Sequence, residues 1–107
     1  MTIQINTDNN ISASEELTTP LIALISEELS RFSSQITRVE VHLADEDGNK
    51  EGQNDKRCVL EARLEGMKPI AVTSHGNTHD QAVEGAIEKL KTSLETTLGR
   101  LSNHQKH

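Results

Sequence analysis

Residues 36–44, ITRVEVHLA, alternate between apolar and charged side chains over most of their length. In an extended chain the two kinds would point to opposite sides, with Val39, Val41 and Leu43 opposed to Arg38, Glu40 and His42. This period of two is typical of a strand with one buried face and one hydrated face. We therefore expect a sheet with a hydrophobic core on one side only.

The same period predicts three further strands, over residues 3–6, 57–65 and 69–74. Between the second and third strands, residues 45–55 contain no apolar side chain, and we expect a mobile loop there. Gly66 and the two residues after it are expected to form a tight turn between the third and fourth strands. Pro69 would then begin the fourth strand, a position where its missing N–H is tolerated.

Apolar residues spaced three or four apart predict a first helix that ends near Phe32. Its start has two alternatives. Ser14 can be the N-cap, which leaves Pro20 inside the helix without a hydrogen bond to donate. Alternatively Thr19 is the cap and Pro20 takes the first helical position.

A second helix is predicted to start at a capping box formed by Thr78 and Gln81. Its apolar face runs to Leu101 and comprises Val83, Ala86, Ile87, Leu90, Leu94, Leu98 and Leu101. We expect residues 1–101 to form one domain and the polar tail, residues 102–107, to be disordered.

The predicted element order is βαβββα, an α+β fold with a four-stranded mixed sheet and two helices packed on one face. A strand–helix–strand unit implies a right-handed crossover, so the first two strands should be parallel. The short links between the later strands imply antiparallel pairing.

Composition excludes several functions. The chain has 107 residues, with 11 Lys and Arg against 17 Asp and Glu, a net charge of −6 that argues against general DNA binding. Phe32 is its one aromatic residue, so it lacks platforms for base stacking. Its one cysteine excludes an internal disulfide and suits a reducing cytoplasm. The N-terminal residues have the pattern of neither an export signal nor a membrane span.

No residue pattern indicates an enzyme. There is no glycine-flanked nucleophile elbow and no phosphate-cradling glycine loop. Cys58 points with Leu60 toward the expected core, where a thiol is usually inert. His75 and His79 flank a predicted turn without a third metal ligand. We expect no catalytic residues, no metal and no cofactor.

Three stretches bring the chain close to a known family. Residues 80–90, DQAVEGAIEKL, with Leu94 after them, resemble the second helix of the ribosome hibernation-promoting factor and ribosome-associated inhibitor family. Residues 27–32, EELSRF, and 36–41, ITRVEV, resemble another recurrent stretch of that family. The resemblance implies a fold related to double-stranded RNA-binding domains. It also implies a short, single-domain protein that binds the small ribosomal subunit under stress and blocks translation.

The resemblance assigns RNA contact to Arg31 and Lys89, which match basic positions of the family. The chain departs from the family at Glu28 and Thr92, where basic residues are common, so its surface should be less basic. From the residues themselves, we add four cations as candidates for ribosomal RNA: Lys56, Arg57, Arg63 and Lys91.

Two interpretations of these cations remain open. They could gather into a strip that docks on ribosomal RNA. Alternatively they pair with nearby carboxylates, with Lys91 bound to Glu88 and Glu95, and the two sheet arginines bound to Glu61 and Glu40. In the second case the protein would be a stress-related interaction module that has lost affinity for ribosomal RNA and binds a protein or a second copy of itself.

Overall fold

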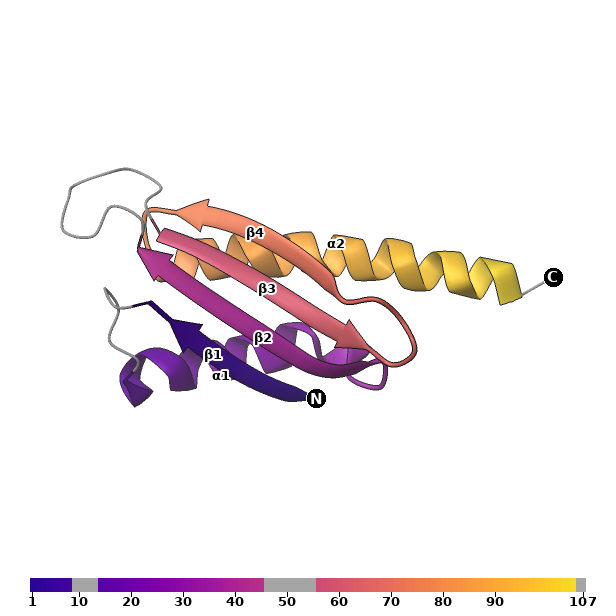
Figure 1. Cartoon of the computed structure of the whole chain (residues 1–107), viewed down its shortest axis with the longest axis horizontal. Coiled ribbons are helices and arrows are strands. Elements are labelled where there is room, and N and C mark those ends of the chain that lie inside the picture. The colour runs from indigo at the N-terminus through magenta and orange to yellow at the C-terminus, as the bar shows by residue number, and fades with distance from the viewer. Residues whose placement is uncertain (9–13, 46–55, 106–107) are drawn as a thin grey trace.

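The computed structural model of the chain describes residues 1–8, 14–45 and 56–105. Figure 1 shows the elements, in the order β1 (Thr2–Thr7), α1 (Glu15–Glu28), the short 3-10 helix η1 (Ser30–Phe32), β2 (Ile36–Asp45), β3 (Lys56–Leu64), β4 (Ile70–Gly76) and α2 (His79–Gln105). The predicted order βαβββα is confirmed. Of the residues predicted to form a loop, 45–55, Asp45 is the last residue of β2, and residues 46–55 lie outside the described residues.

The strands lie in the order β1-β2-β3-β4. β1 pairs in parallel with β2, and the other two pairs are antiparallel, as the connections predict. One apolar row crosses the whole sheet, because the register aligns Ile5, Val41, Leu60 and Val72. Side chains in such a row share one face. The sheet therefore presents a continuous apolar surface for the helices to cover.

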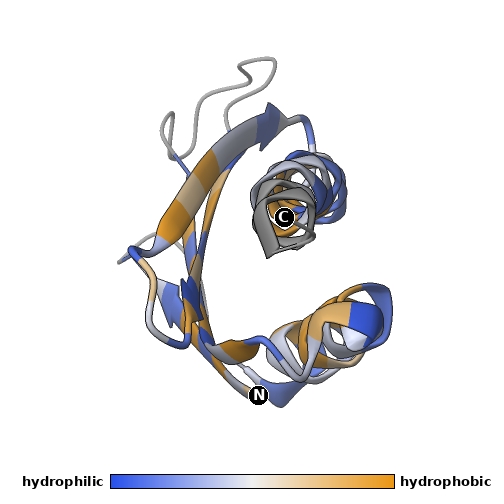
Figure 2. Cartoon of the chain, turned by 90° about the vertical axis from the view of Figure 1, so that its right-hand side faces the viewer, coloured by the Kyte–Doolittle hydropathy of each residue, from blue (hydrophilic) through white to orange (hydrophobic). Residues whose placement is uncertain are grey.

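Figure 2 shows both helices on the same side of the curved sheet. α1 lies against β1, and α2 packs along β3 and β4. Between them and the sheet lies a core in which Val39, Val41, Leu60 and Leu90 are all 0% exposed. The predicted architecture, a one-sided sheet under two helices, is confirmed. Neither helix, over the residues described, combines the length and hydropathy needed to cross a membrane.

The start of α1 follows the first of the two alternatives. Ser14 is the N-cap residue, although its side chain makes no capping hydrogen bond, and Pro20 lies inside the helix. A proline there leaves the carbonyl of Glu16 without its usual donor. Both residues are exposed, so water can bind that carbonyl and the helix tolerates the proline.

The start of α2 has one bond of the predicted capping box, from Gln81 to Thr78, whereas the Gln81 side chain binds the N–H of Asn77 rather than that of Thr78. The Gln81 N–H donates to Thr78 Oγ1 at 3.1 Å, and Gln81 Oε1 accepts from the Asn77 N–H at 3.0 Å. The helix then continues to Gln105, beyond the expected end at Leu101. Neither glycine nor proline interrupts residues 102–105, so the sequence contains no strong stop signal. Residues 106–107 lie outside the described part of the chain.

α2 lies close to β4 where two small residues, Gly85 and Ser74, face each other. A Cβ placed on Gly85 would lie 2.2 Å from Ser74 Oγ and 3.3 Å from Ser74 Cβ. Ser74 is itself buried, at 7% exposed. The absence of a side chain at Gly85 thus sets how near the helix lies to the sheet.

We predict that Gly85→Ala lowers the free energy of unfolding by about 1–3 kcal/mol, because the new methyl group forces the helix and the strand apart. Gly99→Ala is the matched control: a Cβ there meets nothing within 4 Å. Alanine at that helical position should raise stability by about 0.5–1 kcal/mol. Urea denaturation followed by circular dichroism measures both.

Adding Ser74→Ala to Gly85→Ala should recover part of the loss, because it removes the nearer of the two clashing atoms. Equal effects of the Gly85 and Gly99 substitutions would contradict the close approach described here.

Candidate nucleic-acid interface

The six predicted RNA-binding cations do not form one strip. Arg57 and Arg63 lie on the outer face of the sheet, opposite the helices. Arg31 and Lys91 lie between the two helices. Lys56 begins β3, and Lys89 of α2 reaches β4 at one edge of the sheet. The fold therefore distributes these charges over separate parts of the surface.

On the outer face of the sheet, Arg63 lies among carboxylates. Its Nε is 3.3 Å from Glu61 Oε1, and its guanidinium is 3.6 Å from Glu40 Oε2. Arg38 shares Glu40 at 3.5 Å. This half of the face is balanced in charge, as the second interpretation of the cations expects for Arg63.

Arg57 occupies the opposite end of that face. Its side chain is exposed, and the sheet register places it between Ala44 of β2 and His75 of β4. At this end the face carries one arginine and, on the two neighbouring strands, His42 and His75.

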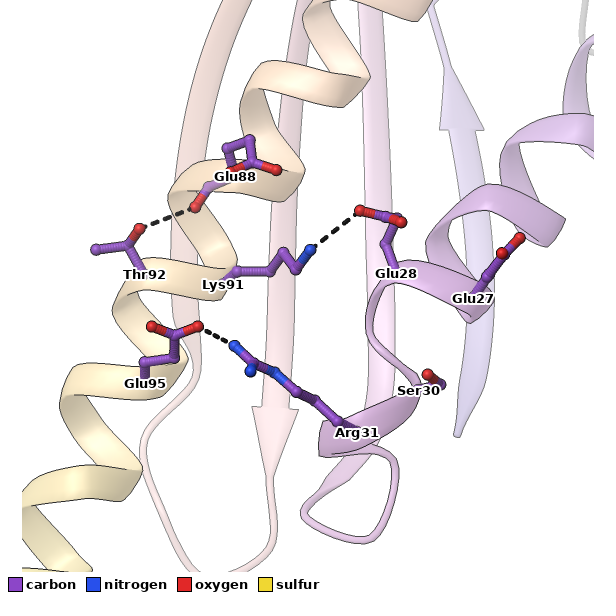
Figure 3. Close-up of a pocket in the computed structure, with 8 residues that line it drawn as sticks. All are labelled: Glu27, Glu28, Ser30, Arg31, Glu88, Lys91, Thr92 and Glu95. Atoms are coloured by element: carbon purple, nitrogen blue, oxygen red, sulfur yellow. Dashed lines mark hydrogen bonds and ion pairs between the residues drawn. The ribbon is translucent and has the colours of Figure 1, made fainter.

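A hollow of about 510 Å³ lies between α1 and α2 (Figure 3). We call it the interhelical groove; its lining is Glu27, Glu28, Ser30, Arg31, Glu88, Lys91, Thr92 and Glu95. Figure 3 shows two ion pairs that cross it, one from Lys91 to Glu28 and one from Arg31 to Glu95. Sequence reasoning named both cations but did not predict that four glutamates would surround them.

Lys91 departs from its predicted pairing. Its Nζ lies 3.0 Å from Glu28 Oε1 on the other helix. It does not pair with Glu88 or Glu95 of its own helix, the partners that the second interpretation expects. Both helices cover the same face of the sheet, which brings a carboxylate of α1 within reach of α2. Glu95 is then free to bind Arg31, whose guanidinium also lies 4.7 Å from the centre of the Phe32 ring.

Lys56 is the least accessible of these paired cations. Its Nζ is 2.9 Å from Asp45 Oδ2, and the two side chains are 21% and 11% exposed. The same aspartate donates its backbone N–H to Asp8 Oδ2 at 3.2 Å. A phosphate would have to displace a half-buried carboxylate to reach Lys56, so this residue is poorly placed for RNA contact.

Lys89 is held differently. Its Nζ donates to the backbone carbonyl of Thr73 at 2.7 Å, and the lysine is exposed. Within the residues that the structure describes, no carboxylate pairs with it. One carbonyl leaves donors of the ammonium group available, so Lys89 can bind an anion without first losing a salt bridge.

Arg31, Lys56, Arg63 and Lys91 each carry a carboxylate partner. Exposed pairs are weak, at about 0–1 kcal/mol, so phosphate can compete for Arg31 and Arg63, whose side chains are 59% and 54% exposed. The net acidic surroundings nevertheless oppose the approach of RNA to the interhelical groove.

Other chemistry finds little support in the described residues. In residues 1–8, 14–45 and 56–105, no group of three His, Cys, Asp or Glu side chains is arranged to hold a metal. Cys58 is 0% exposed, and burial raises its thiol pKa to about 12. Its predicted inward orientation is confirmed, and a buried neutral thiol is a poor nucleophile.

A family model described as "Sigma 54 modulation protein / S30EA ribosomal protein" matches residues 3–102. No match was found among curated proteins.

Two solved structures share the fold. The Thermus thermophilus Protein Y N-terminal domain superposes with a TM-score of 0.72 at 14% identity, covering 91% of this chain and 99% of that one. A ribosomal subunit interface protein from Coxiella burnetii gives 0.69 at 19% identity, with 92% and 99% covered. Identities this low show a common fold only.

We predict that Cys58 does not react with the thiol reagent DTNB at pH 8 in the folded protein and reacts once per chain in urea. Because the folded state holds this thiol neutral, the stability of the fold falls as the pH rises above about 9, where the thiol of the unfolded chain ionises, and goes on falling until about pH 12. Immediate reaction of the native protein at pH 8 would show that the thiol is accessible.

Proposed function

Because the chain belongs to the Sigma 54 modulation protein / S30EA ribosomal protein family, we propose that it binds the small ribosomal subunit under stress and silences translation as a hibernation factor. The observation that carries this proposal is the extent of the family match, residues 3–102. The match includes all the described helices and strands apart from the first residue of β1 and the last turn of α2. The two structural neighbours, a Protein Y N-terminal domain and a ribosomal subunit interface protein, support it.

The proposed action is steric and electrostatic. The domain acts in the cytoplasm as a folded wedge that lysines and arginines hold to phosphates of ribosomal RNA. No bond is made or broken, so the protein works without catalytic residues or a cofactor. A wedge of this kind inhibits translation by occupying space that messenger and transfer RNA need.

Lys89 is the first candidate for phosphate contact. It matches a basic family position, is exposed, and pairs with no carboxylate among the described residues. Arg57 is a further candidate, because its side chain is exposed on the outer face of the sheet. Arg31, Arg63 and Lys91 can contribute after exchanging a carboxylate for a phosphate, whereas Lys56 should contribute least.

This distribution of charge predicts a shallow salt dependence. Two phosphate contacts give a slope of about −2 for the logarithm of the binding constant against the logarithm of salt concentration, whereas six would give about −5. Sedimentation of the protein with purified small subunits across a salt series measures this slope. We expect a slope of about −2. Binding should be strongest at low salt.

We predict that Lys89→Gln weakens cosedimentation with small subunits by about fivefold and makes the salt slope shallower by about one. Thr19→Glu is the control: it lowers the net charge by the same unit at an exposed site of α1, outside the six candidate cations. It should leave binding nearly unchanged. An equal loss in both variants would indicate a response to net charge rather than a contact by Lys89.

Failure of the wild-type protein to cosediment at low salt would overturn the ribosome proposal itself. A protein-interaction module is the second candidate function, and the net acidic interhelical groove is the observation that favours it. Recovery of a protein partner from cells, without ribosomal RNA, would then support the second candidate.

A further inference from the structure

The interhelical groove continues beyond the hollow of Figure 3. An adjoining cavity of about 360 Å³ shares Glu28 and Glu88 with it and adds Leu24, Glu84 and Ile87 to its lining. Leu24 is half-buried and Ile87 is 2% exposed, so these two residues form an apolar floor. The extended groove thus has the form of a channel with an apolar base and charged walls.

The charges of the extended groove do not balance. Five glutamates line it against Arg31 and Lys91, a net charge of −3. Glu28 and Glu95 are used in the two ion pairs across the groove. Glu84 and Glu88 have no cationic partner within the described part of the chain, and both side chains are exposed beside the apolar floor.

A groove of this kind suits neither RNA nor a plain apolar ligand. Phosphates would be repelled by the unpaired carboxylates, and a purely apolar molecule would leave them desolvated without compensation. A ligand that combines cations with an aliphatic group satisfies both features: its cations meet Glu84 and Glu88, and its apolar part covers Leu24 and Ile87.

We propose that the interhelical groove is a docking site for a basic, amphipathic segment of another protein. Lysine or arginine side chains of the segment pair with Glu84 and Glu88, and an aliphatic side chain packs on Leu24 and Ile87. This surface lies between the helices, whereas Lys89 reaches the β4 edge and Arg57 lies on the outer sheet face. Contacts of RNA with Lys89 and Arg57 are therefore compatible with a bound segment, whereas Arg31 and Lys91 line the groove and would be covered by it.

The test uses the purified full chain and a fluorescein-labelled ten-residue peptide of lysine and leucine; a glutamate and leucine peptide of the same pattern is the ligand control. We expect the lysine peptide to bind and the glutamate peptide not to bind. The double variant Glu84→Gln/Glu88→Gln should weaken binding of the lysine peptide by about tenfold. Added salt should weaken it further.

Glu16→Gln/Glu65→Gln is the matched control variant. It removes the same two charges from exposed residues outside the groove, so it should keep nearly full binding. Fluorescence anisotropy gives the dissociation constants, and circular dichroism checks that each variant is folded.

Equal weakening of binding in the two double variants, or no binding of the lysine peptide to the wild type, would overturn the proposal.

Light scattering after gel filtration tests whether a second copy of the chain occupies the groove. A dimer of the chain that dissociates on Glu84→Gln/Glu88→Gln would assign the groove to a second copy instead. None of these measurements involves ribosomes, so their failure is separate from any failure of the proposed function.

Discussion

The structure depends on burying one face of one sheet. β2 and β3 place Val39, Val41, Cys58, Leu60 and Ala62 on that face with no exposed surface, and both helices are needed to cover it. Because successive side chains of a strand point to opposite faces, the residues between these must point to water. The same constraint places the arginines of the sheet on the outer face, and it places the two helices side by side, with a groove between them lined by their charged residues.

Most of the fold could be predicted because its signals are local. The alternation in β2 depends on adjacent residues, and the capping bond from Gln81 to Thr78 lies within four residues. The parallel pairing of β1 followed from the handedness of a crossover. The ends of the helices were harder to predict. Ser14 makes no side-chain capping bond that would distinguish it from Thr19, and α2 has no stop signal after Leu101.

The candidate site was only partly predictable, because its ion pairs join residues far apart in the chain. Lys91 and Glu28 are 63 positions apart, and Arg31 and Glu95 are 64 apart. Sequence spacing suggests pairs within one helix, and Lys91 was wrongly assigned on that basis. Arg31 and Lys91 could be named from the sequence, whereas their partners and the unpaired Glu84 and Glu88 became evident only when the two helices were placed together.

The hydrogen bond from Lys89 to Thr73 has a consequence for solubility. β4 ends the sheet, and backbone groups at a sheet edge offer a template on which another chain can pair and aggregate. Here the Lys89 ammonium occupies one edge carbonyl and adds a hydrated charge beside the strand. Substitution of Lys89 would therefore remove a charge that opposes intermolecular β-pairing, and loss of soluble protein should follow at high concentration.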